Sequence, residues 1–202
     1  MARPTPPARV RRLSSTPPKP AAFDTIDATT HVGLRDRALI GLITYSFARV
    51  GAALAMRVDD VFVQNRRLWV RLREKGGKRH EMPCHHNLEA WLHAYLEGTG
   101  IEGDRKGPLF RTIARGTGRM SQVPLAQSNA HAMIRRRARA AGIATAVGNH
   151  SFRATGITAY LKNGGTLERA AAMANHASTR TTQLYDRRSD EVTLDEVERI
   201  GV

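Results

Sequence analysis

The sequence predicts a mainly α-helical domain of the α+β class, with one small antiparallel sheet of three strands. Two observations carry this prediction. Apolar residues recur at helical spacing over most of the chain, whereas between Val61 and Cys84 they alternate with polar residues, as in strands. Hydrophobic residues make up 41% of the 202 residues, enough to bury a core in one domain with tails or in two small domains.

The first helix is expected to begin at Gly33, because Leu34, Ala38 and Leu42 then form one apolar face. A short helix over Gly51–Met56 follows. Beyond the predicted sheet, the spacing of apolar residues predicts further helices over Asn87–Glu97, Leu125–Ala141, His150 to just before Gly164-Gly165, Leu167–Met173 and Thr179–Asp186. The stretch between the first two of these helices is expected to be a glycine-bearing loop.

The three strands are expected at Val61–Val63, Leu68–Leu72 and His80–Cys84. Gln64-Asn65-Arg66 is the predicted turn between the first two strands, and Gly76-Gly77 is the predicted turn before the third. The chain ends differ in composition. Six of the nine prolines and five basic residues lie among the first twenty positions, so residues 1–22 are predicted to be a disordered basic tail.

The charge balance favours a polyanionic partner. Lys and Arg total 32 against 18 Asp and Glu, a net charge of +14, and neutralising phosphates releases condensed counterions. Charge alone leaves open DNA, RNA, an anionic membrane or no such partner. The single cysteine, Cys84, excludes an internal disulfide and a multi-cysteine zinc site. The longest apolar stretch, Ala38–Ala48, is too short to span a bilayer, so we expect a cytoplasmic protein without a membrane partner.

Three segments contain residues suited to phosphate chemistry. Arg49 directly follows the first apolar helix, His150 and Arg153 lie three positions apart on one predicted helix, and Tyr185 follows His176 by nine residues. Residues three apart on a helix are neighbours, so His150 and Arg153 can address one ligand. Each residue alone is more typical of a structural or surface position, and only their combination is specific.

Together and in this order, the segments resemble the catalytic domain of the tyrosine recombinases, the family of phage integrases and chromosome-dimer resolvases. The 23 residues from Arg153 to His176 and the nine to Tyr185 are typical of that family. The segment Lys75-Gly76-Gly77-Lys78 resembles its lysine-bearing β-turn, with Lys75 in the catalytic register and Lys78 as the nearby alternative. The resemblance runs from about Val32 to Arg188.

The resemblance implies a catalytic domain over residues 23–188 and a C-terminal tail helix within 189–202. It implies a site-specific recombinase that cleaves and rejoins double-stranded DNA through a 3′-phosphotyrosine intermediate, needs no metal or cofactor, and acts as a homotetramer assembled on DNA. The amphipathic segment Leu194–Ile200 could be exchanged between subunits or pack on its own domain.

Two departures from the family pattern stand out. Ala52 occupies a position that usually carries an acidic residue, which Asp59 or Asp60 could replace. The residues before Val32 are too few and too proline-rich for the usual DNA-clamping domain, so the chain is expected to be a catalytic fragment or a naturally short version.

The implied roles follow from the chemistry of each group. Guanidinium groups stay charged and donate in a fork, so Arg49 and Arg153 are expected to clamp the phosphate. His150 and His176 are expected to donate hydrogen bonds to it, with His150 as the candidate base for the Tyr185 hydroxyl. Lys75 is expected to protonate the leaving 5′ oxygen.

DNA contacts are expected from Lys78 and from the arginine run on the helix after Leu125, at Arg135, Arg136 and Arg139. Arg111, Arg115 and Arg119 are read as lining a loop that holds DNA. A solvated helix face is an equal alternative for the arginine run. Two other functions fit the residues: a type IB topoisomerase, which uses similar chemistry, and a DNA-binding accessory protein that kept the fold and lost the reaction.

Overall fold

The computed structural model describes residues 23–186 apart from 24, 74–78 and 145–146. The predicted basic tail, the candidate lysines Lys75 and Lys78 and the tail segment Leu194–Ile200 lie outside the described residues. Among the residues that are described, no helix is both long enough and apolar enough to cross a membrane.

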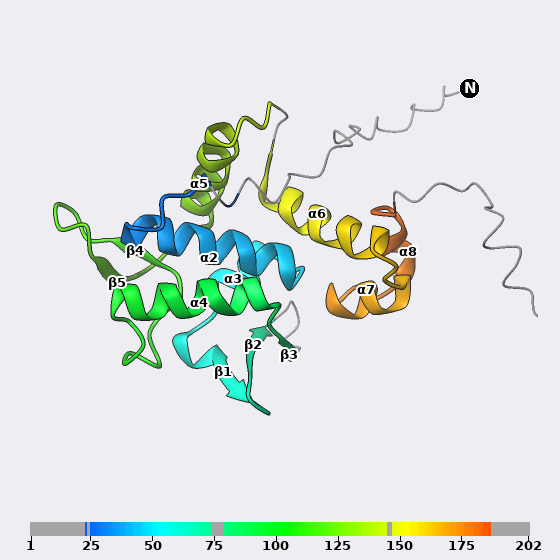
Figure 1. The fold of residues 1–202 in the computed structure, drawn as a ribbon, viewed down its shortest axis with the longest axis horizontal. Coiled ribbons are helices and arrows are strands. Elements are labelled where there is room, and N and C mark those ends of the chain that lie inside the picture. The colour runs from blue at the N-terminus through cyan, green and yellow to red at the C-terminus, as the bar shows by residue number, and fades with distance from the viewer. Residues whose placement is uncertain (1–22, 24, 74–78, 145–146, 187–202) are drawn as a thin grey trace, which may run out of the picture.

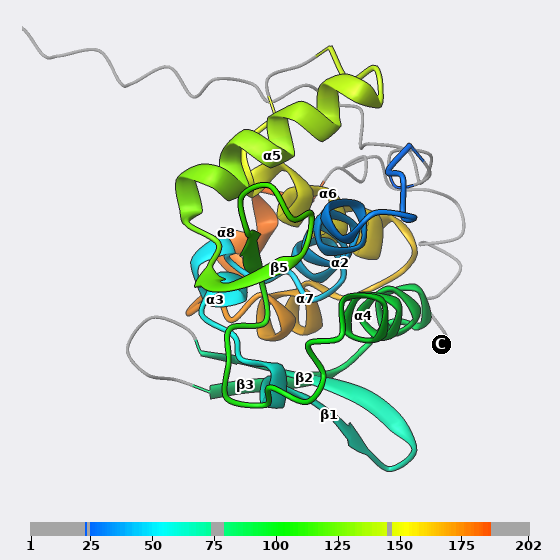
Figure 2. The same cartoon turned by 90° about the vertical axis from the view of Figure 1, so that its left-hand side faces the viewer.

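The helix α2 (His31–Tyr45) forms the centre of the molecule. Thr30 caps its start, where the Thr30 hydroxyl accepts a hydrogen bond from the backbone N–H of Gly33 at 3.1 Å. Almost every residue of α2 from Gly33 to Thr44 is buried, because α4 (His86–Thr99) and α6 (Asn149–Lys162) both pack against it. Figures 1 and 2 show α2 between α5 on one side and α4 with the sheet on the other.

The predicted three-stranded antiparallel sheet is confirmed. It consists of β1 (Val61–Gln64), β2 (Arg67–Arg73) and β3 (Arg79–Pro83), in the order β1-β2-β3. The predicted first turn is present, and both Asn65 and Arg66 adopt the left-handed backbone that such a tight hairpin requires, at φ 50° and 61°. Alternate residues of β2 are buried, which gives the sheet one face toward the core.

The remaining helices largely follow the predicted ranges: α3 (Val50–Leu54), α5 (Gln127–Ala140), α7 (Leu167–Met173) and α8 (Thr179–Gln183). A 3₁₀ turn, η1 (Val58–Asp60), precedes β1 and was not predicted. The helix α8 is shorter than predicted, so Tyr185 lies just beyond its end. The stretch expected to be only a loop contains a second sheet, formed by the antiparallel pair β4 (Arg111–Ile113) and β5 (Met120–Pro124).

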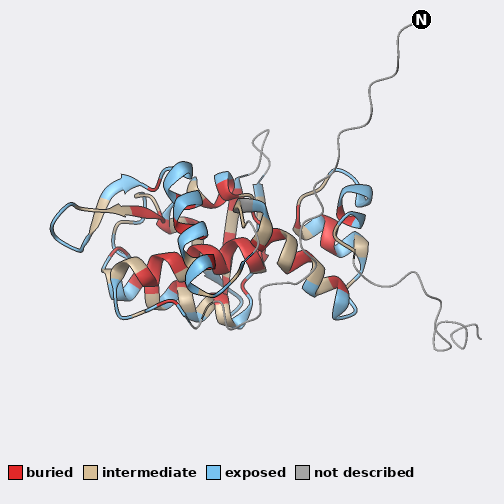
Figure 3. Cartoon of the chain, turned by 90° about the horizontal axis from the view of Figure 1, so that it is seen from above, coloured by how far each residue is buried: buried red, intermediate tan, exposed pale blue. Residues whose placement is uncertain are grey.

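Apolar side chains of the described residues form two clusters. The larger one lies among α2, α3, α4, α5 and the three-stranded sheet, and Figure 3 shows how buried and exposed positions are distributed over the molecule. The smaller one consists of Phe47, Ile157, Leu161, Ala170 and Ala174. These five residues come from the turn after α2, from α6 and from α7 with its C-terminal end, so the small cluster joins the segments that the sequence singles out for chemistry.

Candidate active site

Arg49 lies on the turn that joins α2 to α3. Ser46 ends α2, and its hydroxyl donates a hydrogen bond to the carbonyl of Leu42. Phe47 then adopts a left-handed backbone at φ 54°, which is uncommon for a residue other than glycine. This sharp reversal buries the Phe47 ring in the small cluster and leaves Arg49, half-buried, at the N-cap position of α3.

Arg153 connects this turn to the far end of α7. Its side chain belongs to α6 and is 2% exposed. One guanidinium nitrogen, Nη1, donates to the carbonyl of Phe47, and the other, Nη2, donates to the carbonyl of Ala174 at 2.7 Å. Arg153 therefore holds together segments that are more than a hundred residues apart in the chain. The contact with Phe47 lies two positions before Arg49.

His176 contacts Arg153 at Nη2, the same nitrogen that donates to Ala174. Its Nε2 lies 2.8 Å from Nη2 of Arg153, and its Nδ1 lies 2.8 Å from the hydroxyl oxygen of Thr182 on α8. The preceding residue, Asn175, has a left-handed backbone at φ 46° that turns the chain after α7. The imidazole is thus fixed through both of its nitrogens.

Tyr185 lies next to His176 and is tied to the helix that carries Arg153. The two rings stack with centroids 6.1 Å apart and planes 13° apart. The carbonyl of Tyr185 accepts a hydrogen bond from the Thr158 hydroxyl of α6 at 2.9 Å, and its N–H donates to the carbonyl of Thr182 at 2.9 Å. Of the predicted residues, Arg153 therefore contacts His176, and His176 contacts Tyr185, which packs on the small apolar cluster. Arg49 lies two positions after Phe47, whose carbonyl Arg153 binds.

Three residues that sequence reasoning missed hold this arrangement: Gly156, Thr158 and Thr182. A Cβ atom at Gly156 would lie 1.9 Å from the carbonyl oxygen of Thr44, so only glycine lets α6 approach the end of α2 this closely. Glycine in the middle of a helix was the one available signal, because it lowers helix stability unless close packing requires it.

His150 is placed differently from Arg153. It lies on the first turn of α6 and is exposed, whereas Arg153 is buried. In this structure the pair do not share one environment, although the three-residue spacing suggested it. The segment that carries Lys75 and Lys78 falls outside the described residues, between the end of β2 at Arg73 and the start of β3 at Arg79.

Ala52, which stands where the family usually has an acidic residue, lies in the apolar core with its side chain buried. Asp60 lies at the end of η1, directly before the three-stranded sheet. Its carboxylate accepts from the backbone N–H of Arg57 at 2.9 Å and pairs with Arg73 at 3.3 Å and with Arg71 at 3.8 Å, on the sheet. Asp59 also belongs to η1, and its backbone N–H donates to the carbonyl of Arg105 at 2.8 Å.

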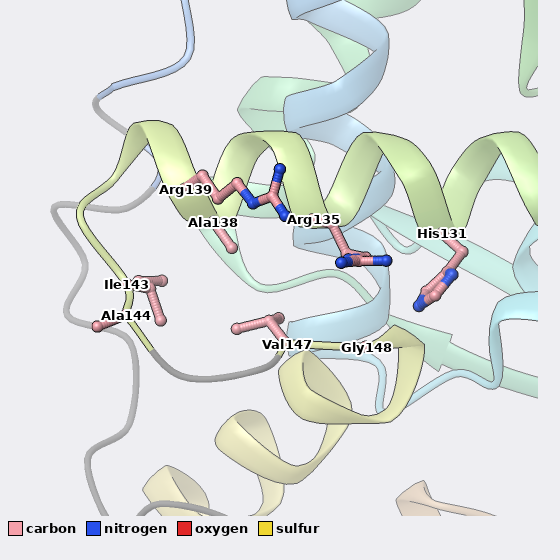
Figure 4. A pocket seen from close by; sticks show the side chains of 8 residues that line it. All are labelled: His131, Arg135, Ala138, Arg139, Ile143, Ala144, Val147 and Gly148. Carbon is pink, nitrogen blue, oxygen red and sulfur yellow. The ribbon is translucent and has the colours of Figure 1, made fainter.

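The arginine run on α5 divides into two groups. Arg136 and Arg137 reach the fully buried carboxylate of Asp36 on α2, at 3.2 and 2.9 Å. Arg135 and Arg139 face the opposite way, where with His131 they line a pocket of about 460 Å³. Figure 4 shows this pocket between α5 and the segment that leads into α6.

Arg111 was wrongly placed in a DNA-holding loop. Its side chain is 2% exposed and belongs to β4. The guanidinium donates to the carbonyl of Pro108 at 2.7 Å and to the Gln122 side chain at 2.9 Å, and it pairs with Asp104 at 2.8 Å. Arg111 is therefore a structural residue that joins β4 to β5 and to the preceding loop.

Comparison with known proteins identifies the family. The family model described as "Phage integrase family" matches residues 20–191, which include all the segments above. The chain belongs to the phage integrase family. Among curated members, it is 30% identical over 181 residues to tyrosine recombinase XerD of Ralstonia nicotianae and 33% identical over 158 residues to that of Mycobacterium leprae. These alignments cover 89% and 75% of this chain.

Solved structures of recombinases have the same fold. The chain matches the XerA recombinase with a TM-score of 0.71 and 26% identity, over 97% of this chain and 65% of that one. It matches the XerH site-specific recombinase, bound to a palindromic difH substrate after cleavage, with a TM-score of 0.65 and 23% identity, over 89% of this chain and 49% of that one. The chain spans about half the length of the curated relatives named above, at 56% and 48%.

Proposed function

We propose that this chain is the catalytic part of a site-specific DNA recombinase in which Tyr185 is the nucleophile. The observation that carries the proposal is the position of Arg153. Its guanidinium touches the turn beside Arg49, the end of α7 and the His176 ring, on which the ring of Tyr185 stacks. These contacts support the proposal, because the guanidinium of Arg153, the imidazole of His176 and the ring of Tyr185 lie next to one another, and Arg49 lies two positions after Phe47, whose carbonyl Arg153 binds. In this proposal residues 23–188 form the catalytic domain.

A phosphodiester resists nucleophiles because it is negatively charged. Catalysis of its attack therefore depends on donors placed where charge shifts in the transition state. We assign Arg49 and Arg153 to this role. A guanidinium carries five N–H donors, so Arg153 can hold the backbone of its own fold and also address a phosphate oxygen. His176, beside it, is the candidate for a further hydrogen bond to the same phosphate.

The proposed reaction exchanges one ester for another. The Tyr185 oxygen forms a bond to phosphorus, the bond from phosphorus to the 5′ oxygen breaks, and the phenol proton passes to His150 as the candidate base. Lys75 is the candidate that protonates the leaving 5′ oxygen. The bond energy is retained in the 3′-phosphotyrosine ester, so a second 5′ hydroxyl can reverse the step and reseal DNA without ATP.

Double-stranded DNA is the proposed partner, in the cytoplasm. The net charge of +14 supports this, as does the pocket lined by His131, Arg135 and Arg139, which adjoins the start of α6. XerH, a structural neighbour, was solved with its DNA substrate. We assign Arg135, Arg139 and Lys78 to phosphate contacts, and Arg136 contributes to them while it pairs with Asp36. Assembly as a homotetramer on two DNA sites, with Leu194–Ile200 exchanged between subunits, completes the proposal.

A covalent-capture experiment tests the nucleophile. The full chain is incubated with a pool of nicked duplexes of random sequence. After cleavage, the short fragment that carries the free 5′ hydroxyl diffuses away, which leaves the protein trapped on the DNA. Adducts that survive denaturation are sequenced, and the selected duplex becomes the substrate for variants. We expect an adduct with the wild-type chain and none with Tyr185→Phe. An adduct of equal yield in Tyr185→Phe would show that another residue attacks the phosphate.

The same preparation distinguishes the rival functions. Relaxation of supercoiled plasmid that lacks the selected sequence would support a type IB topoisomerase. Tight binding to the selected duplex without any adduct would support an accessory protein that lost the reaction.

A further inference from the structure

We propose that Thr182 is a positioning residue for His176, whose hydroxyl lets the imidazole change from accepting to donating at Nε2 when a phosphate arrives. This inference rests on the proposed function, because it concerns the same site. Thr182 does not touch the reacting atoms in the proposal. It acts through the ring of His176.

The hydrogen bonds around the imidazole fix its protonation in the free protein. A guanidinium only donates hydrogen bonds, and Nη2 of Arg153 lies 2.8 Å from Nε2 of His176. Nε2 is therefore the acceptor in this contact. In a neutral imidazole the proton is then on Nδ1, so the Nδ1–H donates to the Thr182 hydroxyl oxygen 2.8 Å away.

A phosphate at the site demands the opposite arrangement. The oxygens of a phosphodiester only accept hydrogen bonds, so His176 can bind one through Nε2 only when that nitrogen carries a proton. The ring reaches this state by tautomer exchange, in which Nδ1 gives up its proton and Nε2 takes one, with no net proton gained. Nδ1 then becomes an acceptor and requires a donor.

A hydroxyl is the side-chain group that satisfies both states. It accepts from Nδ1–H before the exchange and, after rotation about its C–O bond, donates to Nδ1 afterwards. Thr182 is 0% exposed, so water does not reach its side chain to replace it. Without this partner Nδ1 loses the hydrogen bond in both states, and it then faces the fully buried position of residue 182 with no polar group there, which is unfavourable.

The backbone of Thr182 has a separate task. Its carbonyl accepts the N–H of Tyr185 at 2.9 Å and so starts the turn that carries the proposed nucleophile. Replacement by valine keeps the backbone and the branched shape and removes the hydroxyl alone. Replacement by serine keeps the hydroxyl and removes the methyl group. Thr181, the exposed neighbour on the same helix, provides a matched control.

The test compares Thr182→Val, Thr182→Ser and Thr181→Val with the wild-type chain on the nicked duplex selected above. At saturating duplex we expect Thr182→Val to form the adduct about ten- to a hundredfold more slowly, as the loss of one buried hydrogen-bond partner implies. Its dissociation constant for the duplex should stay within about threefold of wild type, because the hydroxyl does not contact DNA. Thr182→Ser should restore most of the rate, and Thr181→Val should match wild type.

A wild-type rate in Thr182→Val would overturn the inference, as would a Thr182→Ser variant that folds but is as slow as valine. Nitrogen-15 NMR of the free protein gives a readout that does not depend on recombination. We expect the His176 proton on Nδ1 in the wild-type chain, and a proton on Nε2 there would also overturn the inference. Failure of the proposed function would look different: the wild-type chain would form no adduct, or the adduct would persist in Tyr185→Phe.

Discussion

Replacing Gly156 by alanine should separate the two arginines of the proposed site. Gly156 lies on α6, one turn beyond Arg153, where the helix crosses the end of α2. An added Cβ would lie 1.9 Å from the Thr44 carbonyl oxygen and 2.9 Å from the Phe47 ring. Real Cβ contacts stay above 3.0 Å, so α6 must move away from α2 by about 1.1 Å. The atom in contact, the Thr44 carbonyl oxygen, belongs to the backbone, so it cannot move away as the end of a flexible side chain can.

Two opposing contributions determine how far Gly156→Ala lowers the free energy of unfolding. Overpacking of this kind costs about 1–3 kcal/mol, and alanine is favoured over glycine inside a helix by about 1 kcal/mol. With a backbone atom in the way we take the upper end, so the free energy of unfolding should fall by about 2 kcal/mol. The domain should stay folded, since stabilities are about 5–15 kcal/mol. Cleavage should fall about a hundredfold, because a displacement near 1 Å has effects of that order on positioned groups.

Gly51→Ala is the matched control. Gly51 is on α3, and a Cβ added there would meet no atom within 4 Å. This variant should be as stable as wild type, or more stable by up to about 1 kcal/mol, and should cleave normally. Urea unfolding measures stability, and adduct formation at saturating duplex measures cleavage. A Gly156→Ala chain that matches wild type in both would refute the reasoning that close packing of α6 on α2 positions Arg153.

Three further outcomes follow. Asp36→Asn should lower the free energy of unfolding by about 3–5 kcal/mol, because the fully buried carboxylate of Asp36 pairs with Arg35, Arg136 and Arg137. Glu81→Gln should lower it by less than about 1 kcal/mol, although the exposed pair of Glu81 with Arg71 is just as short at 2.6 Å. Equal losses of the two variants in urea unfolding would contradict this expectation. Burial raises the pKa of the Cys84 thiol from 9.0 to about 12, so iodoacetamide should label it slowly at pH 8 until urea unfolds the chain. Since the unfolded thiol ionises first, Cys84 should also lower stability as pH rises from about 9 toward 12, and a Cys84→Ala variant should show a smaller decline than wild type. Arg153→Ala should abolish the adduct. It should also lower the free energy of unfolding by about 3 kcal/mol or more, because the carbonyls of Phe47 and Ala174 lose their charged donors. DNA binding lost in step with cleavage would instead mark Arg153 as a simple DNA contact.

Periodicity was sufficient to predict the elements whose apolar faces pack on the core. It predicted α2, α7 and the strands of the first sheet from the spacing of their apolar residues. The alternation matches the burial of β2, whereas α2 is buried almost all round and no residue of β1 is buried. It missed β4 and β5 for a physical reason. Arg111 is buried in β4 only because Pro108, Gln122 and Asp104 supply its partners, and a charged residue with unknown tertiary partners reads as an exposed loop position.

The order and spacing of Arg49, Arg153, His176 and Tyr185 were visible in the sequence, but the contacts among them were not. Helical spacing suggested that His150 and Arg153 share a face. Three positions advance a helix by about 300°, which leaves about 60° between the two side chains. In this structure that difference is enough to expose His150 and to bury Arg153. The hydroxyls of Thr158 and Thr182 gave no signal, because their partners lie on other elements.

The contacts of Arg153 explain why the fold and the proposed reaction depend on the same atoms. Carbonyls of Phe47 and Ala174 hold the guanidinium in place without DNA, and its contact with His176 orients the imidazole. A donor fixed in advance needs no reorganisation when charge develops on a phosphate, which is the condition for strong electrostatic catalysis. The same fixation makes the residues interdependent, because a change at Gly156 would act on the proposed phosphate contacts through Arg153 and the turn that carries Arg49, and loss of the Thr182 hydroxyl would act through His176. Effects of such changes on cleavage should therefore not add, as is general for residues that share one network.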